Sequence, residues 1–202
     1  MEIQMQIITF LFLMLGPFKI VGPFAKITQG AEPVLIRKLA IRSIIFASIA
    51  LLLAGAMGQI IMRKYGIPMP ILGIAAGIIL FLVALLNIIQ QFTPAPSQEK
   101  AAMTPSLNMA MNPIAFPTIV TPYGIAAVIM FLSVAPDLNG RLYIAGVVLA
   151  IMMLNLIIML ITRYIYKALS MALAILGSIL GVVQVALGLL IIYNQLKILL
   201  AS

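Results

Sequence analysis

The chain has 202 residues, of which 64% are hydrophobic and 8% are charged, and its formal net charge is +8. Soluble domains carry about 25% charged residues, so the composition excludes a soluble domain and indicates an all-α integral membrane protein. There is no cysteine and no histidine, which excludes disulfides and removes the usual ligands of transition metals. We therefore expect no metal, no cofactor and no catalytic residue, and hence no enzyme.

The basic residues stand singly or in pairs at the ends of apolar runs. Nucleic-acid binding needs clustered lysines and arginines that follow a phosphate backbone, so this distribution argues against such a partner. The partner it indicates is the lipid bilayer, with the positive charge controlling topology through the positive-inside rule. The N-terminus has no basic n-region and no small-residue cleavage site, so we expect no removable signal peptide.

Six segments have the length and hydrophobicity of membrane-crossing helices, which need about 20 residues each. They are residues 3–28, 39–62, 70–92, 106–133, 142–162 and 168–196. Residues 93–105 form a polar, proline-rich stretch that is typical of a linker loop. The chain thus divides into a first three-helix half, residues 1–92, and a second, residues 106–202.

An even number of spans brings both termini to one side of the membrane. The loops after the first, third and fifth spans carry seven basic residues with their flanks, whereas the opposite side carries four. The positive-inside rule makes the first set cytoplasmic. This predicts a multi-pass membrane protein with its N- and C-termini outside.

Two of the spans contain prolines that interrupt helical hydrogen bonding. In the fourth span, Pro117 and Pro122 lack the backbone N–H and crowd the carbonyl four residues back. The first span contains Gly16-Pro17 and Gly22-Pro23 with Lys19 between them. We expect helices 1 and 4 to be broken near the membrane midplane, where exposed backbone is tolerated only if protein buries it or it lines a watery cavity.

The third and sixth spans resemble each other at a constant offset of 104 residues, which aligns residues 71–77 (ILGIAAG) with residues 175–181 (ILGSILG). The proline breaks also correspond, at slightly smaller offsets. Because each half has three helices, the halves enter the membrane in opposite senses, which predicts an inverted repeat of the kind found in secondary transporters. Chance similarity between apolar segments is the alternative.

Glycines four residues apart mark both of these spans, at Gly73 and Gly77 and at Gly177 and Gly181. Such small-residue stripes let helix backbones approach closely. We interpret them as sites of packing within the chain, with a homodimer interface as the alternative.

Several stretches resemble the MarC family of integral membrane proteins. They are GQIIM (58–62), YGIPMP (65–70), GIAAG (73–77), PIAFPT (113–118), TP (121–122) and IA (125–126). The resemblance implies a six-span protein of the bacterial or archaeal inner membrane, similar to small transporters of the amino-acid exporter type, some linked to small neutral amino acids. The chain departs from the family's pattern at Gly16, where an Asp or Asn usually precedes the first-repeat proline.

A ligand is expected between the two broken helices. Lys19 is the only charged residue that we expect deep in the membrane, and such residues mark functional sites by default; snorkelling to the interface is the alternative. The helix starts after Pro23 and Pro122 offer free N–H groups to a carboxylate, unless both prolines merely kink packed helices. The candidate substrate-binding residues are Gly16, Pro17, Lys19, Gly22, Pro23, Phe24, Asn112, Pro113, Pro117, Thr118, Thr121, Pro122, Tyr123 and Gln184. Asn155 is a weaker candidate, because amides within spans also bond helix to helix.

The function predicted from these features is a secondary transporter or exporter of small solutes, with neutral amino acids as substrates. Coupling to H⁺ would use Lys19, and coupling to Na⁺ would use carbonyls at the breaks with the hydroxyl of Thr118 or Thr121. The alternatives are a non-transporting membrane scaffold or assembly protein, and a small-solute channel.

Overall fold

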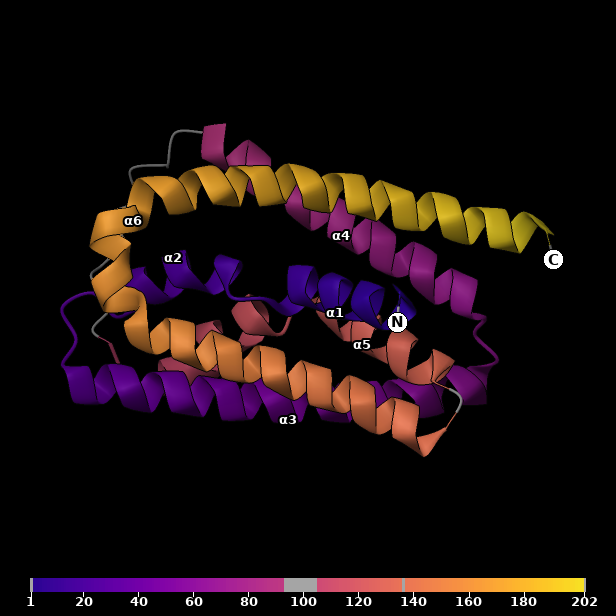
Figure 1. Ribbon diagram of the computed structural model, residues 1–202, viewed down its shortest axis with the longest axis horizontal. Coiled ribbons are helices and arrows are strands. Elements are labelled where there is room, and N and C mark those ends of the chain that lie inside the picture. Colours follow the sequence, from indigo (N-terminus) through magenta and orange to yellow (C-terminus); the bar gives the residue numbers. More distant parts are fainter. Residues whose placement is uncertain (1, 93–104, 136, 202) are drawn as a thin grey trace.

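The computed structural model describes residues 2–92, 105–135 and 137–201, and these form a bundle of helices. The helices are α1 (Glu2–Leu15), α2 (Phe18–Ile27), α3 (Pro33–Tyr65), α4 (Met69–Phe92), η1 (Leu107–Ala110), η2 (Met111–Ile119), α5 (Pro122–Val134) and α6 (Leu138–Ala201). Successive passes along the bundle alternate in direction, and the two chain ends lie toward the same end of its long axis (Figure 1). The predicted linker, residues 93–105, lies outside the described residues except for Pro105.

Within the described part of the chain, five helical stretches are long and apolar enough to cross a membrane, and a bent pair brings the number to six. The first stretch, Ile7–Ile27, combines α1 and α2, and the bent pair joins η1 and η2 to α5 at an angle of 65°. The prediction of an all-helical membrane protein is therefore confirmed. α3 begins with Pro33 at its first turn, where the missing N–H is harmless, and it ends at Gly66, which adopts φ +60°.

The last two predicted spans belong to one helix. Residues Leu138–Ala201 are all helical and form α6, but α6 doubles back on itself and so contains two arms, Leu138–Tyr164 and Gly177–Ala201 (Figure 1). The loop expected at residues 163–167 is therefore wrong, since this segment is helical. The sequence has no glycine or proline between Gly146 and Gly177, so neither residue marks the turn between the two arms.

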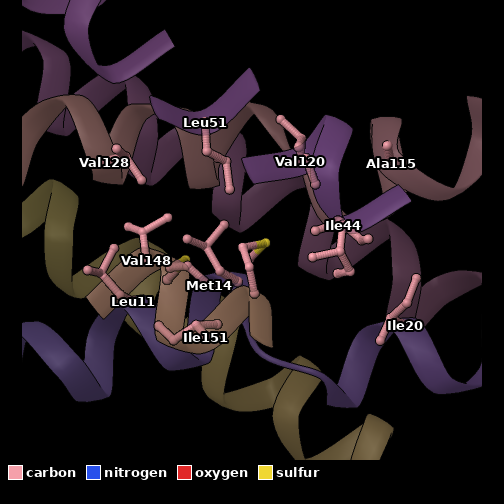
Figure 2. Packing of buried hydrophobic residues seen from close by; sticks show 14 of the residues in the cluster. Leu11, Met14, Ile20, Ile44, Leu51, Ala115, Val120, Val128, Val148 and Ile151 are labelled. Atoms are coloured by element: carbon pink, nitrogen blue, oxygen red, sulfur yellow. The ribbon is translucent and has the colours of Figure 1, made fainter. Parts of the chain in front are cut away.

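The core is an apolar cluster to which α1, α3, α5 and the first arm of α6 contribute. Figure 2 shows Leu11 and Met14 of α1 close to Val148 and Ile151 of α6. α1 and α2 run between the two arms of α6 in Figure 1 and contact α6. The first broken segment is thereby held at the centre of the bundle, where its backbone is shielded.

Glycines of both stripes lie at a contact within the chain, where α4 packs against the second arm of α6. A Cβ added at Gly77 would lie 2.8 Å from Ile192 and 2.9 Å from the carbonyl oxygen of Gly188. A Cβ added at Gly181 would lie 3.1 Å from Ile88. These small residues allow the close approach of two antiparallel helices.

Candidate functional site

The first span is interrupted between α1 and α2 at Gly16 and Pro17. Pro17 has no N–H to continue the hydrogen-bonding pattern of α1, and the Gly16 N–H closes the helix by donating to the Phe12 carbonyl at 2.7 Å. A Cβ on Gly16 would lie 2.1 Å from that same oxygen, so only glycine fits here. Phe12 and Phe18 meet edge to face across the interruption, with ring centroids 5.7 Å apart.

Side chains from both arms of α6 satisfy carbonyls at the end of α1. The Asn155 Nδ2 donates to the Leu15 carbonyl at 2.8 Å, and the Gln184 Nε2 donates to the Leu13 carbonyl at 3.3 Å. The last four carbonyls of a helix have no partner within it, so these bonds replace the missing ones. Asn155 is 1% exposed, and its Oδ1 has no hydrogen-bond partner among the described residues.

Lys19 links the end of α1 to the start of α5. Its Nζ donates to the Met14 carbonyl and lies 5.2 Å from the centre of the Tyr123 ring. Both are favourable partners for an ammonium group, the carbonyl through the negative end of a helix dipole and the ring through its π face. The side chain therefore turns back toward the interruption, as helical side chains do, rather than toward the end of α2 that carries Lys26.

The second interruption lies between η2 and α5. Asn112 and Phe116 have extended backbone dihedrals, as expected for residues that precede proline, and η2 is therefore irregular. α5 then begins at Pro122, and the Thr121 Oγ1 accepts a hydrogen bond from the Gly124 N–H at 3.2 Å. A threonine cap followed by proline in the first turn is a favourable helix start.

The two interruptions border one cavity of about 720 Å³. Ten of the fourteen predicted residues line it: Gly16, Lys19, Gly22, Pro23, Pro117, Thr118, Thr121, Pro122, Tyr123 and Gln184. The cavity therefore brings together residues from the first span, the fourth span and the last arm of α6.

The other four predicted residues lie outside the cavity lining. Pro17 is buried at the start of α2, Phe24 is in the apolar core, Asn112 is exposed, and the Pro113 carbonyl accepts a hydrogen bond from the Thr118 hydroxyl at 2.7 Å. The helix start expected after Pro23 is also wrong, because Pro23 lies inside α2. Its missing N–H leaves only the Lys19 carbonyl without its helical donor, which membrane helices tolerate.

Two helices face the cavity with the same spacing of residues. On α2 the lining residues include Lys19, Gly22, Pro23 and Lys26, next to Phe18, and on the second arm of α6 they are Gly177, Leu180, Gly181 and Gln184. Positions i, i+3, i+4 and i+7 share one face of a helix. The same periodicity in the sequence could have identified four further lining residues, namely Lys26, Gly177, Leu180 and Gly181. No comparable signal marked Asn87, Val83 or Tyr166, which the tertiary fold brings to the wall.

A second, much smaller pocket shares Tyr123 with the cavity. It has a volume of about 10 Å³ and is lined by Phe10, Met14, Ala76, Leu80, Tyr123, Ala127, Met130 and Ile191. Leu80 and Tyr123 are only 1% and 5% exposed. Tyr123 is the residue that lines both spaces.

Comparison with known proteins places the whole chain in one family. The sequence model described as "MarC family integral membrane protein" matches residues 1–200. The chain belongs to the MarC family. This confirms the resemblance read from the proline and glycine motifs, and with the apolar helices it makes the chain an integral, multi-pass membrane protein.

The MarC chain is also similar to a curated relative over its full length. It is 26% identical to the UPF0056 membrane protein MJ1677 of Methanocaldococcus jannaschii over 202 residues, which cover 98% of each chain. No solved structure matches it.

Proposed function

We propose that this MarC protein is a secondary transporter or exporter of small solutes, which bind in the cavity between α2, α5 and the second arm of α6. The observation that carries the proposal is the pair of spaces that share Tyr123 in their linings. The larger has a volume of about 720 Å³ and the smaller about 10 Å³. An open cavity that ends at a buried aromatic wall is the arrangement expected of a carrier closed on one side.

We further propose that the two halves form an inverted repeat. A two-fold axis between the halves would place each residue of the first half in a position equivalent to that of the residue 104 numbers later. Every contact between the halves should then occur twice, the second time between the two equivalent residues. Gly77 approaches Ile192, and Gly181 approaches Ile88. Adding 104 to residues 77 and 88 gives 181 and 192, so each contact is the counterpart of the other, which supports the repeat.

The same relation connects the two spaces. Three residues of the small pocket correspond to three residues of the large cavity: Ala76 to Leu180, Leu80 to Gln184, and Ile191 to Asn87. We infer that the small pocket is the closed counterpart of the open cavity. Transport then consists of opening one space while closing the other, in keeping with alternating access between opposed repeats.

The proposal assigns binding rather than catalysis to the cavity, because its described lining has no carboxylate, histidine or cysteine to act as an acid, base or nucleophile. We also propose that the protein lies in the inner membrane with both termini outside, and that H⁺ or Na⁺ is the coupling ion. We treat the functional unit as one chain, since Gly73, Gly77 and Gly181 pack within the chain, with a homodimer as the alternative.

Neutral amino acids are the first substrates to test. Lys19 lines the cavity and provides a cation for a carboxylate, and the family resemblance points to the same class. The protein is reconstituted in liposomes, and uptake and counterflow of labelled alanine, glycine, serine and threonine are measured under H⁺ and Na⁺ gradients. We expect counterflow of at least one of these solutes.

Three outcomes separate the candidate functions. Saturable counterflow supports a carrier, whereas flux that does not saturate and shows no counterflow supports the small-solute channel. No flux of any small solute by protein shown to be folded supports the scaffold and contradicts the proposal. Tyr123→Ala should increase leakage if the ring separates the two spaces, and Tyr193→Ala, at an exposed tyrosine outside both linings, is its control.

A further inference from the structure

The wall of the large cavity carries positive charge. Lys19 and Lys26 line it, and no aspartate or glutamate is among its described lining residues. The two lysines are seven residues apart on α2, about two helical turns, so they project from the same face. A cleft lined by charges of one sign within apolar walls concentrates solutes of the opposite sign.

The last three carbonyls of α1, at the first interruption, already accept hydrogen bonds from the protein's own side chains. Transporters commonly use carbonyls freed at broken helices to coordinate cations. Here the carbonyls of Leu13 and Leu15 accept hydrogen bonds from Gln184 and Asn155, at 3.3 and 2.8 Å. The Met14 carbonyl, between them, accepts from Lys19. A solute ammonium group would have to share these carbonyls with the protein's own donors, one of which is itself a cation.

The Lys19 ammonium, in contrast, still has N–H donors available for a solute. An ammonium group has three N–H donors, and the partners that the structure shows for Lys19 are one carbonyl and one aromatic ring. No carboxylate among the described residues pairs with it. A half-buried ammonium within a membrane span is costly without a counterion, and a carboxylate brought by a solute would provide that counterion.

We propose that the cavity selects small organic anions, namely carboxylates without an α-ammonium group such as short 2-hydroxy or 2-oxo acids, over zwitterions of the same size. Lys19 pairs with the carboxylate, and the exposed Lys26 attracts it electrostatically. This inference rests on the proposed function, which assigns the cavity as the solute site. The selectivity itself can be measured as binding, without transport.

The test compares three ligands that share a three-carbon skeleton and differ in charge. Lactate is an anion, alanine a zwitterion and alaninamide a cation at neutral pH. Their affinities for the purified full chain are measured by isothermal titration calorimetry at low ionic strength. We expect lactate to bind at least tenfold more tightly than alanine, and alaninamide not to bind. Added salt should weaken lactate binding, because screening reduces the attraction of exposed charges.

Variants identify the groups responsible. We expect Lys19→Met to weaken lactate binding at least tenfold, because a charged hydrogen bond is lost, and Lys19→Arg to retain part of it. Lys26→Met should weaken binding about threefold, because it removes only a longer-range attraction. Lys197→Met is the matched control, since Lys197 is exposed and outside the cavity lining. If Lys19→Met fails to fold, Lys26→Met and the ligand series still decide the question.

The outcomes for selectivity and for transport are distinct. Alanine binding as tightly as lactate, or lactate binding that is unchanged in Lys26→Met and in folded Lys19→Met, overturns the anion selectivity and leaves a carrier of amino acids in place. Selective lactate binding without flux of lactate in liposomes supports the selectivity and contradicts the proposed transport.

Discussion

At the scale of single residues, three polar side chains in the apolar spans donate hydrogen bonds to carbonyls at the end of α1. Asn155, Gln184 and Lys19 come from different segments, and each donates a hydrogen bond to a carbonyl in residues 13–15. An unpaired carbonyl in a low-dielectric interior is costly. These side chains therefore stabilise the interruption, and Lys19 and Gln184 also line the cavity.

Replacing Asn155 with Leu should destabilise the protein by about 1 kcal/mol, because the buried Leu15 carbonyl loses its donor. Chemical unfolding in mixed micelles measures the change. Asn194→Leu is the control, since Asn194 is exposed on the second arm of α6 and should tolerate the change. Equal stabilities of the two variants would contradict the capping role of Asn155.

Gly16→Ala should destabilise the folded state by about 1–3 kcal/mol, the usual cost of overpacking, because the new Cβ would lie 2.1 Å from the Phe12 carbonyl oxygen. At Gly146 a Cβ would meet no atom within 4 Å. Gly146→Ala should therefore be neutral or stabilise α6 by about 0.5–1 kcal/mol. Thermal unfolding of the two variants gives the comparison, and a stable Gly16→Ala protein would show that the interruption can relax.

At the scale of helices, the effect of each proline depends on its position relative to a helix start. Pro122 is in the first turn of α5, where its missing N–H breaks no bond, and Thr121 caps the helix. Pro17 immediately precedes α2. Pro23, by contrast, lies within α2, and the helix continues through it. The interruptions therefore occur at Gly16–Pro17 and between Ile119 and Pro122.

Thr121→Val should destabilise the start of α5 by about 1 kcal/mol, because the Gly124 N–H loses its acceptor while the shape of the side chain is kept. Thr121→Ser retains the hydroxyl and should be close to the parent protein. Hydrogen exchange of peptides covering residues 122–128 measures the change, with faster exchange expected in the Val variant only. Similar exchange in both variants would exclude a capping role for the hydroxyl.

At the scale of the whole molecule, the two spaces that Tyr123 lines form one proposed route. Residues that differ by 104 in number occupy matching places in the open cavity and the small pocket. α4 and the second arm of α6 pack closely through glycines, so movement of one half against the other is expected to occur around this contact. The route requires that each space opens to a different side of the membrane.

Single cysteines test this route, because the chain contains none of its own. We expect Gln184→Cys to react with a membrane-impermeant thiol reagent added from one side, since Gln184 lines the open cavity. Leu80→Cys should be protected without solute, since Leu80 is 1% exposed, and should react from the opposite side during transport. Leu51→Cys, at a fully buried core position, is the unreactive control.

Labelling rates of the three variants in sealed vesicles, with the reagent on one side at a time, provide the measurement. Reaction of both cavity variants from the same side would contradict alternating access.

The sequence predicted the all-helical membrane fold, because long apolar runs in a bilayer must satisfy their backbone hydrogen bonds within a helix. It also predicted ten of the cavity-lining residues, since glycine, proline and a buried lysine mark places where helical bonding or burial is costly. The i, i+3, i+4 and i+7 spacing on α2 would have added Lys26. The continuous helix through residues 163–167 was not predicted, because basic residues at the end of an apolar run were interpreted as a loop.

By itself, then, the sequence determined where the chain is apolar and helical, because this follows from local backbone chemistry and composition, and its motifs indicated the family. The tertiary structure alone decided which carbonyls Asn155, Gln184 and Lys19 satisfy, and that Tyr123 lines both the cavity and the small pocket. Contacts such as that between Asn155 and Leu15 join residues 140 positions apart. They depend on how helices pack, and no local pattern encodes that packing.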